Sequence, residues 1–244
     1  MSLLALCLVA IGLGDMVRRP AGSRWQPPVL CVGALITGAM LAGMWQTADL
    51  ALLALASTVG AAWLVESERA DRNGARQARP LLILGAGVAT LILLSGFGSD
   101  ADGLIGRWLV WVGASVPADR ALMALGVLLV QVSTANQVVR LILASVGAVK
   151  PAGQPQPSDQ LKGGRLLGSM ERLLIVGLGL AGQLTLATAV VAAKSIIRFP
   201  EISAKRDPEA GRVGIDDVTE YFLVGSFASW IHAFAGLALV ATTA

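Results

Sequence analysis

The chain has 244 residues, of which 55% are hydrophobic and only 14% charged, and its formal net charge is +3. Soluble domains are typically about 45–50% apolar and about 25% charged, so one water-exposed domain could not bury this much aliphatic surface. The composition excludes an ordinary soluble enzyme. Because Lys and Arg residues lie between apolar runs, they favour membrane loops over a nucleic-acid-binding face. The sequence therefore predicts an all-α protein, a polytopic bundle of transmembrane helices.

Six apolar runs approach or exceed the roughly 17–25 residues that a helix needs to cross a bilayer. They are predicted to be helices, because backbone N–H and C=O groups find no other partners in hydrocarbon. A shorter run, Ser2–Gly14, is predicted to be a first span and not a cleaved signal peptide, since no basic residues precede it. The six longer runs are Leu30–Trp45, Leu50–Val65, Pro80–Phe97, Ala121–Ala148, Leu173–Ala193 and Phe222–Thr242.

Basic residues gather in the connectors Arg18–Arg24 and Arg69–Arg79, which the positive-inside rule places in the cytoplasm. The N-terminus and the loop Ser99–Gly103 are then outside. Segment Gly103–Gly113 is either a surface or re-entrant helix, giving about seven crossings, or a short span, giving about eight. The slightly more basic loop 194–212 favours eight, because that loop is then inside. Tryptophans near the ends of the apolar runs are interpreted as interfacial anchors.

The Pro-, Gly- and Gln-rich stretch 149–163 is a linker by composition. It separates N-terminal transmembrane helices, 1–148, from a C-terminal helical pair with a charged connecting loop, 164–244. Cys7 and Cys31 fall inside apolar runs and match no metal-binding spacing, so they are predicted to be buried thiols. No catalytic constellation, metal site or cofactor motif is recognised.

Small residues recur at helical spacing on the last two runs. Gly177 and Ala181 share a predicted face of the first, and Gly225 and Ser229 share one of the second. Small faces let membrane helices approach closely. We expect these helices to pack together or against a second subunit, although a high Gly and Ala content alone would produce similar spacing.

Three residues are candidates for a polar pathway through the bundle: Gln137, Arg140 and His232. Gln137 and Arg140 share a face of a long apolar run, and such polar groups are expected to avoid lipid. Alternatively, Arg140 reaches toward the interface. His232 is the only histidine and lies within the last run. Its possible roles are a proton relay, a ligand contact, or a neutral imidazole bonded to a neighbouring helix.

Three C-terminal segments carry a family resemblance. They read GRLLGSMERLLI at 164–175, AAKSIIRF at 192–199 and EYFLVGS at 220–226. These resemble a bacterial family of integral membrane proteins of unknown function, with motifs G-x-x-I-G-x-x-E-R-x-L-I, A-A-K-S-I-x-R-F and E-Y-x-L-I-G-T. The family's early H-x-x-x-D-F and later D-Q-x-x-H are not matched, because Ile11 replaces the first His, and Arg120 and Met123 follow Asp119. The resemblance implies a bacterial membrane protein but no particular activity.

Opposite charges in these segments cluster at predicted helix ends, with Glu171 and Arg172 just before one span. An antiparallel hairpin would bring the residues after that span level with those that open the next. There they would pair, orient the helices, or bind an anion or lipid headgroup. The candidate anion- or ligand-binding residues are Lys194, Ser195, Arg198, Glu220 and Tyr221.

Three functions are open on this basis. The leading hypothesis is a non-enzymatic, multi-pass protein of the inner (plasma) membrane that passes or senses a small solute or ion. The second is a scaffold or subunit that assembles as a homo-oligomer or with a membrane partner, and the third is a lipid-modifying membrane enzyme. The expected partner in each case is the lipid bilayer, with no nucleic acid, metal or cofactor.

Overall fold

The computed structural model describes residues 1–18, 23–149, 164–204 and 215–243, and over these ranges it is all-helical. This confirms the predicted all-α class. The elements are α1 (Ser2–Val17), α2 (Gln26–Ala42), α3 (Thr47–Asn73), α4 (Ala78–Leu93), the 3-10 turn η1 (Ser95–Phe97), α5 (Gly103–Trp111), α6 (Ala118–Val132), α7 (Thr134–Ser145), α8 (Gly164–Leu180), α9 (Leu184–Ala204) and α10 (Ile215–Thr242).

The chain divides into two compact units, residues 1–134 with 238–244 (unit 1) and residues 135–237 (unit 2). The predicted run Ala121–Ala148 is therefore two helices, α6 and α7, separated at Ser133. The Ser133 hydroxyl lies 2.9 Å from the carbonyl oxygens of both Gly12 and Leu129. Such a side-chain bond offers the backbone an alternative to the helical ladder. Residues 150–163 of the predicted linker lie outside the described part.

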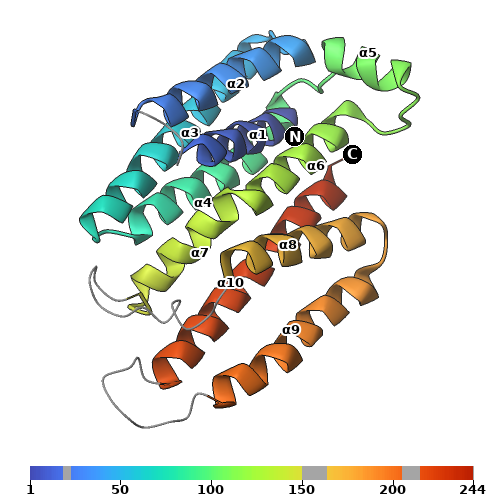
Figure 1. The fold of residues 1–244 in the computed structure, drawn as a ribbon. Coiled ribbons are helices and arrows are strands. Elements are labelled where there is room, and N and C mark those ends of the chain that lie inside the picture. The colour runs from blue at the N-terminus through green and yellow to red at the C-terminus, as the bar shows by residue number, and fades with distance from the viewer. Residues whose placement is uncertain (19–22, 150–163, 205–214, 244) are drawn as a thin grey trace. The chain divides into compact units, whose positions relative to one another are not determined.

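In unit 1, α1 lies among α2, α3, α4 and α6 and packs against each of them (Figure 1). Leu, Ile, Val and Ala residues occur all around this helix, and 11 of its 16 residues are buried. A helix without a polar stripe has no face suited to water. Its position in the middle of the unit follows from that composition.

The loop after α4 forms hydrogen bonds with the starts of α3 and α6 at one end of unit 1. The Ser99 amide and hydroxyl donate to the Asp49 carboxylate at the start of α3, at 2.8 and 2.9 Å. The Ala101 amide donates to Asp119 at the start of α6, at 3.0 Å. The end of α4 and the start of α6 therefore lie at the same end of the unit, so the segment that connects them does not cross it.

That connecting segment contains α5, whose 9 residues extend about 14 Å at 1.5 Å per residue. The hydrocarbon core of a bilayer is about 30 Å thick. A helix of this length is too short to cross a bilayer by itself, so α5 is compatible with the alternative of a surface or re-entrant helix. Trp108 and Trp111 on α5 are 58% and 82% exposed, as expected for interfacial side chains.

Two glycines allow α1 and α6 to cross closely. A Cβ atom on Gly12 would lie 2.8 Å from the Cβ of Leu129, and one on Gly126 would lie 2.9 Å from the carbonyl oxygen of Ala5. Both distances are below van der Waals contact. Close approach through small residues is the usual way for membrane helices to gain packing energy, and here it joins α1 to α6.

In unit 2, α8 and α9 pack against each other as a hairpin. The turn between them contains Gly182 with φ of +75°, a left-handed conformation that glycine adopts at little cost and that commonly ends helices. The predicted single helix Leu173–Ala193 is therefore wrong. Within 164–244 the described residues form three helices, where the sequence predicted a pair.

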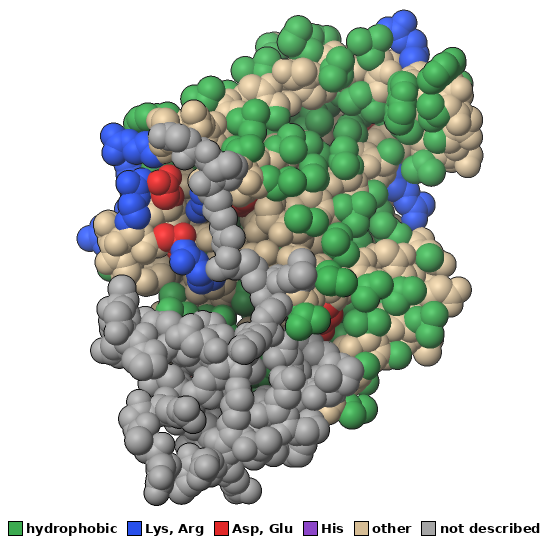
Figure 2. Space-filling model, viewed as in Figure 1, with side chains coloured by type: hydrophobic (Ala, Val, Ile, Leu, Met, Phe, Trp, Pro, Cys, Tyr) green, Lys and Arg blue, Asp and Glu red, His purple; other side chains and the backbone are tan. Residues whose placement is uncertain are grey.

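Among the described residues, two helices are long and apolar enough to cross a membrane: Thr47–Asn73 and Thr219–Thr242. The consecutive helices α6 and α7 make a third if the bent pair counts as one span. Many large apolar side chains point outward, and Figure 2 shows them spread over the face in view, with Lys and Arg side chains toward its edges. These features are compatible with a membrane location.

Candidate functional site

Polar side chains gather inside unit 2, where α7, α8 and α10 come together. Glu171 and Arg172 are 7% and 2% exposed, so both ionisable groups are shielded from solvent. Burying an ion costs several kcal/mol unless other groups compensate its charge. We call the following set the Arg172 cluster: Asn136 from α7, Ser169, Glu171 and Arg172 from α8, and Ser229 and Trp230 from α10.

The Arg172 guanidinium joins the three helices. Its Nη1 donates to the Ser229 hydroxyl at 2.9 Å, and its Nη2 donates to Asn136 Oδ1 at 2.7 Å and to Ser169 Oγ at 3.3 Å. Asn136 Nδ2 in turn donates to Ser169 Oγ at 3.0 Å. The planar fork of donors is thus held in a defined orientation by an amide and two hydroxyls.

The Glu171 carboxylate supplies the negative charge of the cluster. Trp230 Nε1 donates to Glu171 Oε1 at 2.7 Å, and the Trp230 ring packs edge-on against Phe227 with centroids 5.4 Å apart. An indole N–H is a donor only, so the carboxyl oxygen of Glu171 is the acceptor in this contact. Positive and negative groups are therefore both buried, on consecutive residues of one helix.

Glu171 and Arg172 were predicted to lie ahead of a span, but the structure places them in the middle of α8. The helix begins at Gly164 and ends at Leu180, so these residues have about two turns of helix on either side. Hydropathy rises at Leu173, which is why the span was predicted to begin there. The first half of the helix was therefore not predicted, and the Glu171 and Arg172 side chains are buried in the structure.

One of the three predicted pathway residues lies close to the Arg172 cluster. His232, on α10, is near enough to Arg172 for the guanidinium charge to act on its imidazole. Gln137 is half-buried and follows Asn136 on α7, whereas Arg140 is exposed. The arrangement brings His232 together with the buried charges and leaves Arg140 at the surface of unit 2.

The predicted anion-binding residues are only partly described. The side chains of Lys194, Ser195 and Arg198 lie outside the described part, so the site built on them stays a prediction. Glu220 is exposed and Tyr221 is half-buried near the start of α10.

The predicted packing residues divide into three groups. A Cβ on Gly225 would lie 3.5 Å from Leu143, so this glycine faces α7, while Ser229 bonds to Arg172. A Cβ on Gly177 would have no atom within 4 Å. Ala181 lies in the turn after α8 and is exposed, so it does not share a helix face with the residues of α9.

Unit 1 contains an ion pair with little exposure that was not predicted from the sequence: the Asp15 and Arg18 side chains are 3% and 15% exposed. Arg18 Nη2 lies 2.5 Å from Asp15 Oδ1 and donates to the Ser67 hydroxyl at 2.8 Å. Trp63 Nε1 donates to Asp15 Oδ2 at 3.0 Å, and the Trp63 side chain is fully buried. The interpretation of Trp63 as an interfacial anchor is therefore wrong. The spacing Asp15-x-x-Arg18, one helical turn, was the available signal.

Over the described residues, no three His, Cys, Asp or Glu side chains are grouped in a way that could hold a metal ion. Cys7 and Cys31 are free and buried, as predicted. The chemistry that the Arg172 cluster offers is charge and hydrogen bonding: a guanidinium, a carboxylate, an amide and hydroxyls, with an imidazole nearby.

Fold and site together define an all-helical protein with membrane-capable helices and a buried charged centre. Comparison with known proteins gives no match to the chain: no family model, no curated protein and no solved structure is similar to it. The chemistry of the Arg172 cluster itself is therefore the best guide to its function.

Proposed function

We propose that the chain is a multi-pass protein of the bacterial inner membrane that binds a small solute or ion at the Arg172 cluster and passes or senses it without catalysing a reaction. The observation that supports this proposal is the burial of Arg172, only 2% exposed, at the middle of a largely apolar helix. Ionisable groups at such depth are rare in membrane proteins and commonly mark ion or substrate pathways.

The proposed topology has eight crossings. Helices α1 to α4 each cross, α5 lies on the outer surface, and α6 with α7 crosses once. The hairpin of α8 and α9 then contributes two crossings and α10 the last. This order puts both C-terminal connectors, which contain Lys150, Lys162, Lys205, Arg206 and Arg212, on the cytoplasmic side, as the positive-inside rule favours.

The hydrogen bonding of the cluster favours a small anion as the bound species. Arg172 donates to an amide and to two hydroxyls, which are neutral acceptors. A guanidinium binds an anion by charge as well as by directed N–H bonds, often through two parallel bonds, so a small anion suits this donor. Trp230 meanwhile holds the Glu171 carboxylate by its own hydrogen bond.

The test is anion flux and binding in reconstituted vesicles. Wild-type protein would be assayed with chloride, nitrate and formate, beside Arg172→Gln and the matched control Arg140→Gln, an exposed arginine of the same unit. We expect flux or saturable binding of at least one anion, lost in Arg172→Gln and kept in Arg140→Gln. Equal behaviour of wild type and Arg172→Gln, with correct folding checked by circular dichroism, would refute the proposal.

A second candidate, assembly with another membrane subunit, is favoured by one observation. Gly177 on α8 is exposed, and a side chain there would touch nothing in the described part of the chain. An exposed glycine on a membrane helix allows another helix to approach closely. If assembly is the function, Gly177→Leu should reduce cross-linked oligomers while the flux of single copies is unchanged.

A further inference from the structure

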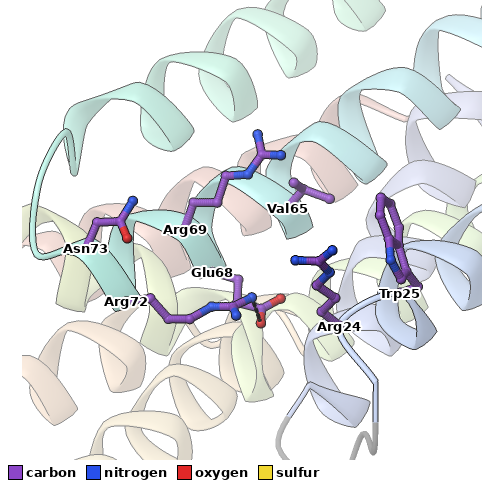
Figure 3. Close-up of a pocket in the computed structure, with 7 residues that line it drawn as sticks. All are labelled: Arg24, Trp25, Val65, Glu68, Arg69, Arg72 and Asn73. Carbon is purple, nitrogen blue, oxygen red and sulfur yellow. Dashed lines mark hydrogen bonds and ion pairs between the residues drawn. The ribbon is translucent and has the colours of Figure 1, made fainter.

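A basic pocket lies at the end of unit 1 away from the Asp49–Ser99 contact. It has a volume of about 260 Å³ and opens between the start of α2 and the last turns of α3. Figure 3 shows the guanidinium groups of Arg24 and Arg72 on opposite sides of Glu68. We call it the arginine pocket; its polar and aromatic lining consists of Arg24, Trp25, Glu68, Arg69, Arg72 and Asn73.

Positive charge exceeds negative charge in the arginine pocket, with three guanidinium groups against one carboxylate. Arg72 pairs with that carboxylate, Glu68. Arg69 pairs at 2.5 Å with Glu66, which does not line the pocket. Once both ion pairs are counted, one guanidinium charge of the lining is left over, that of Arg24.

Arg24 is the strongest candidate to contact a ligand. Its guanidinium lies 5.5 Å from the centre of the Trp25 ring, and among the described residues no carboxylate pairs with it. The ring orients the guanidinium by a cation–π contact that leaves its N–H donors available. An arginine held in this way is suited to bidentate recognition of a phosphate.

The basic surface continues beyond the arginine pocket. A neighbouring cavity of about 210 Å³ shares Arg69 and Asn73 and adds Arg76, Arg79 and Glu66, the last of which pairs with both Arg69 and Arg79. Arg76 has φ of +59°, a conformation that non-glycine residues rarely adopt and that tends to occur at functional sites. The two cavities together are lined by five guanidinium groups and two carboxylates, and this excess of positive charge attracts an anion.

The level of the arginine pocket along α3 indicates which anion it meets. Val65, which also lines it, ends the apolar part of α3, and the charged turns Glu66–Asn73 follow. Trp25 is 58% exposed at the start of α2, a typical position for a tryptophan at a membrane surface. In the proposed topology this is the level of the cytoplasmic headgroups, where anionic lipids concentrate.

We propose that the arginine pocket binds a phosphate group, and that this group belongs to an anionic phospholipid headgroup. Arg24 and Arg72 donate to the phosphate oxygens, and Trp25 packs against the glycerol and upper acyl region. The proposal concerns residues in unit 1 and is independent of the ligand at the Arg172 cluster.

The test measures lipid binding by thermal stabilisation in a neutral detergent. Purified full-length protein would be titrated with short-chain phosphatidylglycerol, with phosphatidylcholine of the same chain length, and with sodium phosphate. We expect saturable stabilisation by phosphatidylglycerol, much less by phosphatidylcholine, whose choline cation opposes the basic lining, and none by millimolar phosphate. Added salt should weaken the effect, because the pocket is open to solvent.

Two substitutions and one control complete the test. Arg24→Gln and Arg72→Gln should each weaken phosphatidylglycerol binding about tenfold, the usual effect of losing one hydrogen bond to a charged group. Arg120→Gln, which replaces an exposed arginine at the other end of unit 1, should not change it. Unchanged affinity in both pocket variants would overturn the phosphate site. Equal affinity for free phosphate and phosphatidylglycerol would overturn the lipid as its source.

Discussion

The crossing of α1 and α6 gives a sharp prediction about the replacement of one glycine by alanine. In Gly126→Ala the new methyl group would lie 2.9 Å from the carbonyl oxygen of Ala5, 3.0 Å from the Cβ of Leu8 and 3.2 Å from the amide nitrogen of Val9. Two of these atoms belong to the α1 backbone, so no rotamer change relieves the clash. The helices must move apart instead.

The magnitude follows from two opposing effects. Replacing glycine by alanine inside a helix stabilises it by up to about 1 kcal/mol, whereas overpacking a tight interface costs about 1–3 kcal/mol. Because the contacts at Gly126 are with backbone atoms, we expect the second effect to dominate, for a net loss of about 1–2 kcal/mol. Gly12→Ala should have a similar effect. The double variant should lose less stability than the two single variants added together, because both changes open the same interface.

Gly33 is the matched control. It lies inside α2, where a Cβ atom would have no neighbour within 4 Å, so Gly33→Ala should leave stability unchanged or raise it by up to about 1 kcal/mol. Thermal unfolding of the purified protein in detergent should then separate the two variants by about 4–8 °C. If Gly126→Ala unfolds at the same temperature as Gly33→Ala, the close crossing of α1 and α6 is refuted.

Three further predictions concern buried charge, thiols and topology. Asp15→Asn should lower the free energy of unfolding by about 3 kcal/mol in chemical denaturation, because it leaves the Arg18 charge buried without its partner; a loss below about 1 kcal/mol would mean that the pair is solvated. Cys7 and Cys31, both 0% exposed, should not react with a maleimide until the protein is denatured, and rapid labelling of folded protein would contradict their burial. In cells, Arg72→Cys and Arg120→Cys should be labelled by an impermeant maleimide from opposite sides of the membrane, and labelling from one side would rule out the proposed topology.

Hydropathy predicted the existence of most helices but not where they break. The run Ala121–Ala148 is apolar throughout, and the break at Ser133 depends on an acceptor, the carbonyl of Gly12, that is distant in sequence. In the run Leu173–Ala193, Gly177 was assigned to a packing face, whereas the helix breaks at Gly182, which was assigned to none. Glycine is common both in helix-packing faces and in turns, and only the φ of +75° shows that Gly182 belongs to a turn.

The candidate site was predicted less completely than the fold. His232 was singled out because a lone histidine within a span is conspicuous, and the structure places it near Arg172. Arg172 itself was assigned to a helix end, because sequence alone does not show which neighbouring helices supply acceptors. Asn136 and Ser229, which do so, become recognisable only when α7 and α10 are placed beside α8.

The enclosed position of α1 has a consequence for biosynthesis. This helix leaves the ribosome before α6, and the glycine-lined contact between the two requires residues 18–117 to be synthesised before α6 begins. At about 5–20 residues per second, α1 therefore waits roughly 5 to 20 s beside lipid or the insertion machinery before its last neighbour arrives. A ribosome that stalls in that interval would release a fragment in which α1 has no contact with α6. Such a fragment is a natural target for membrane proteases.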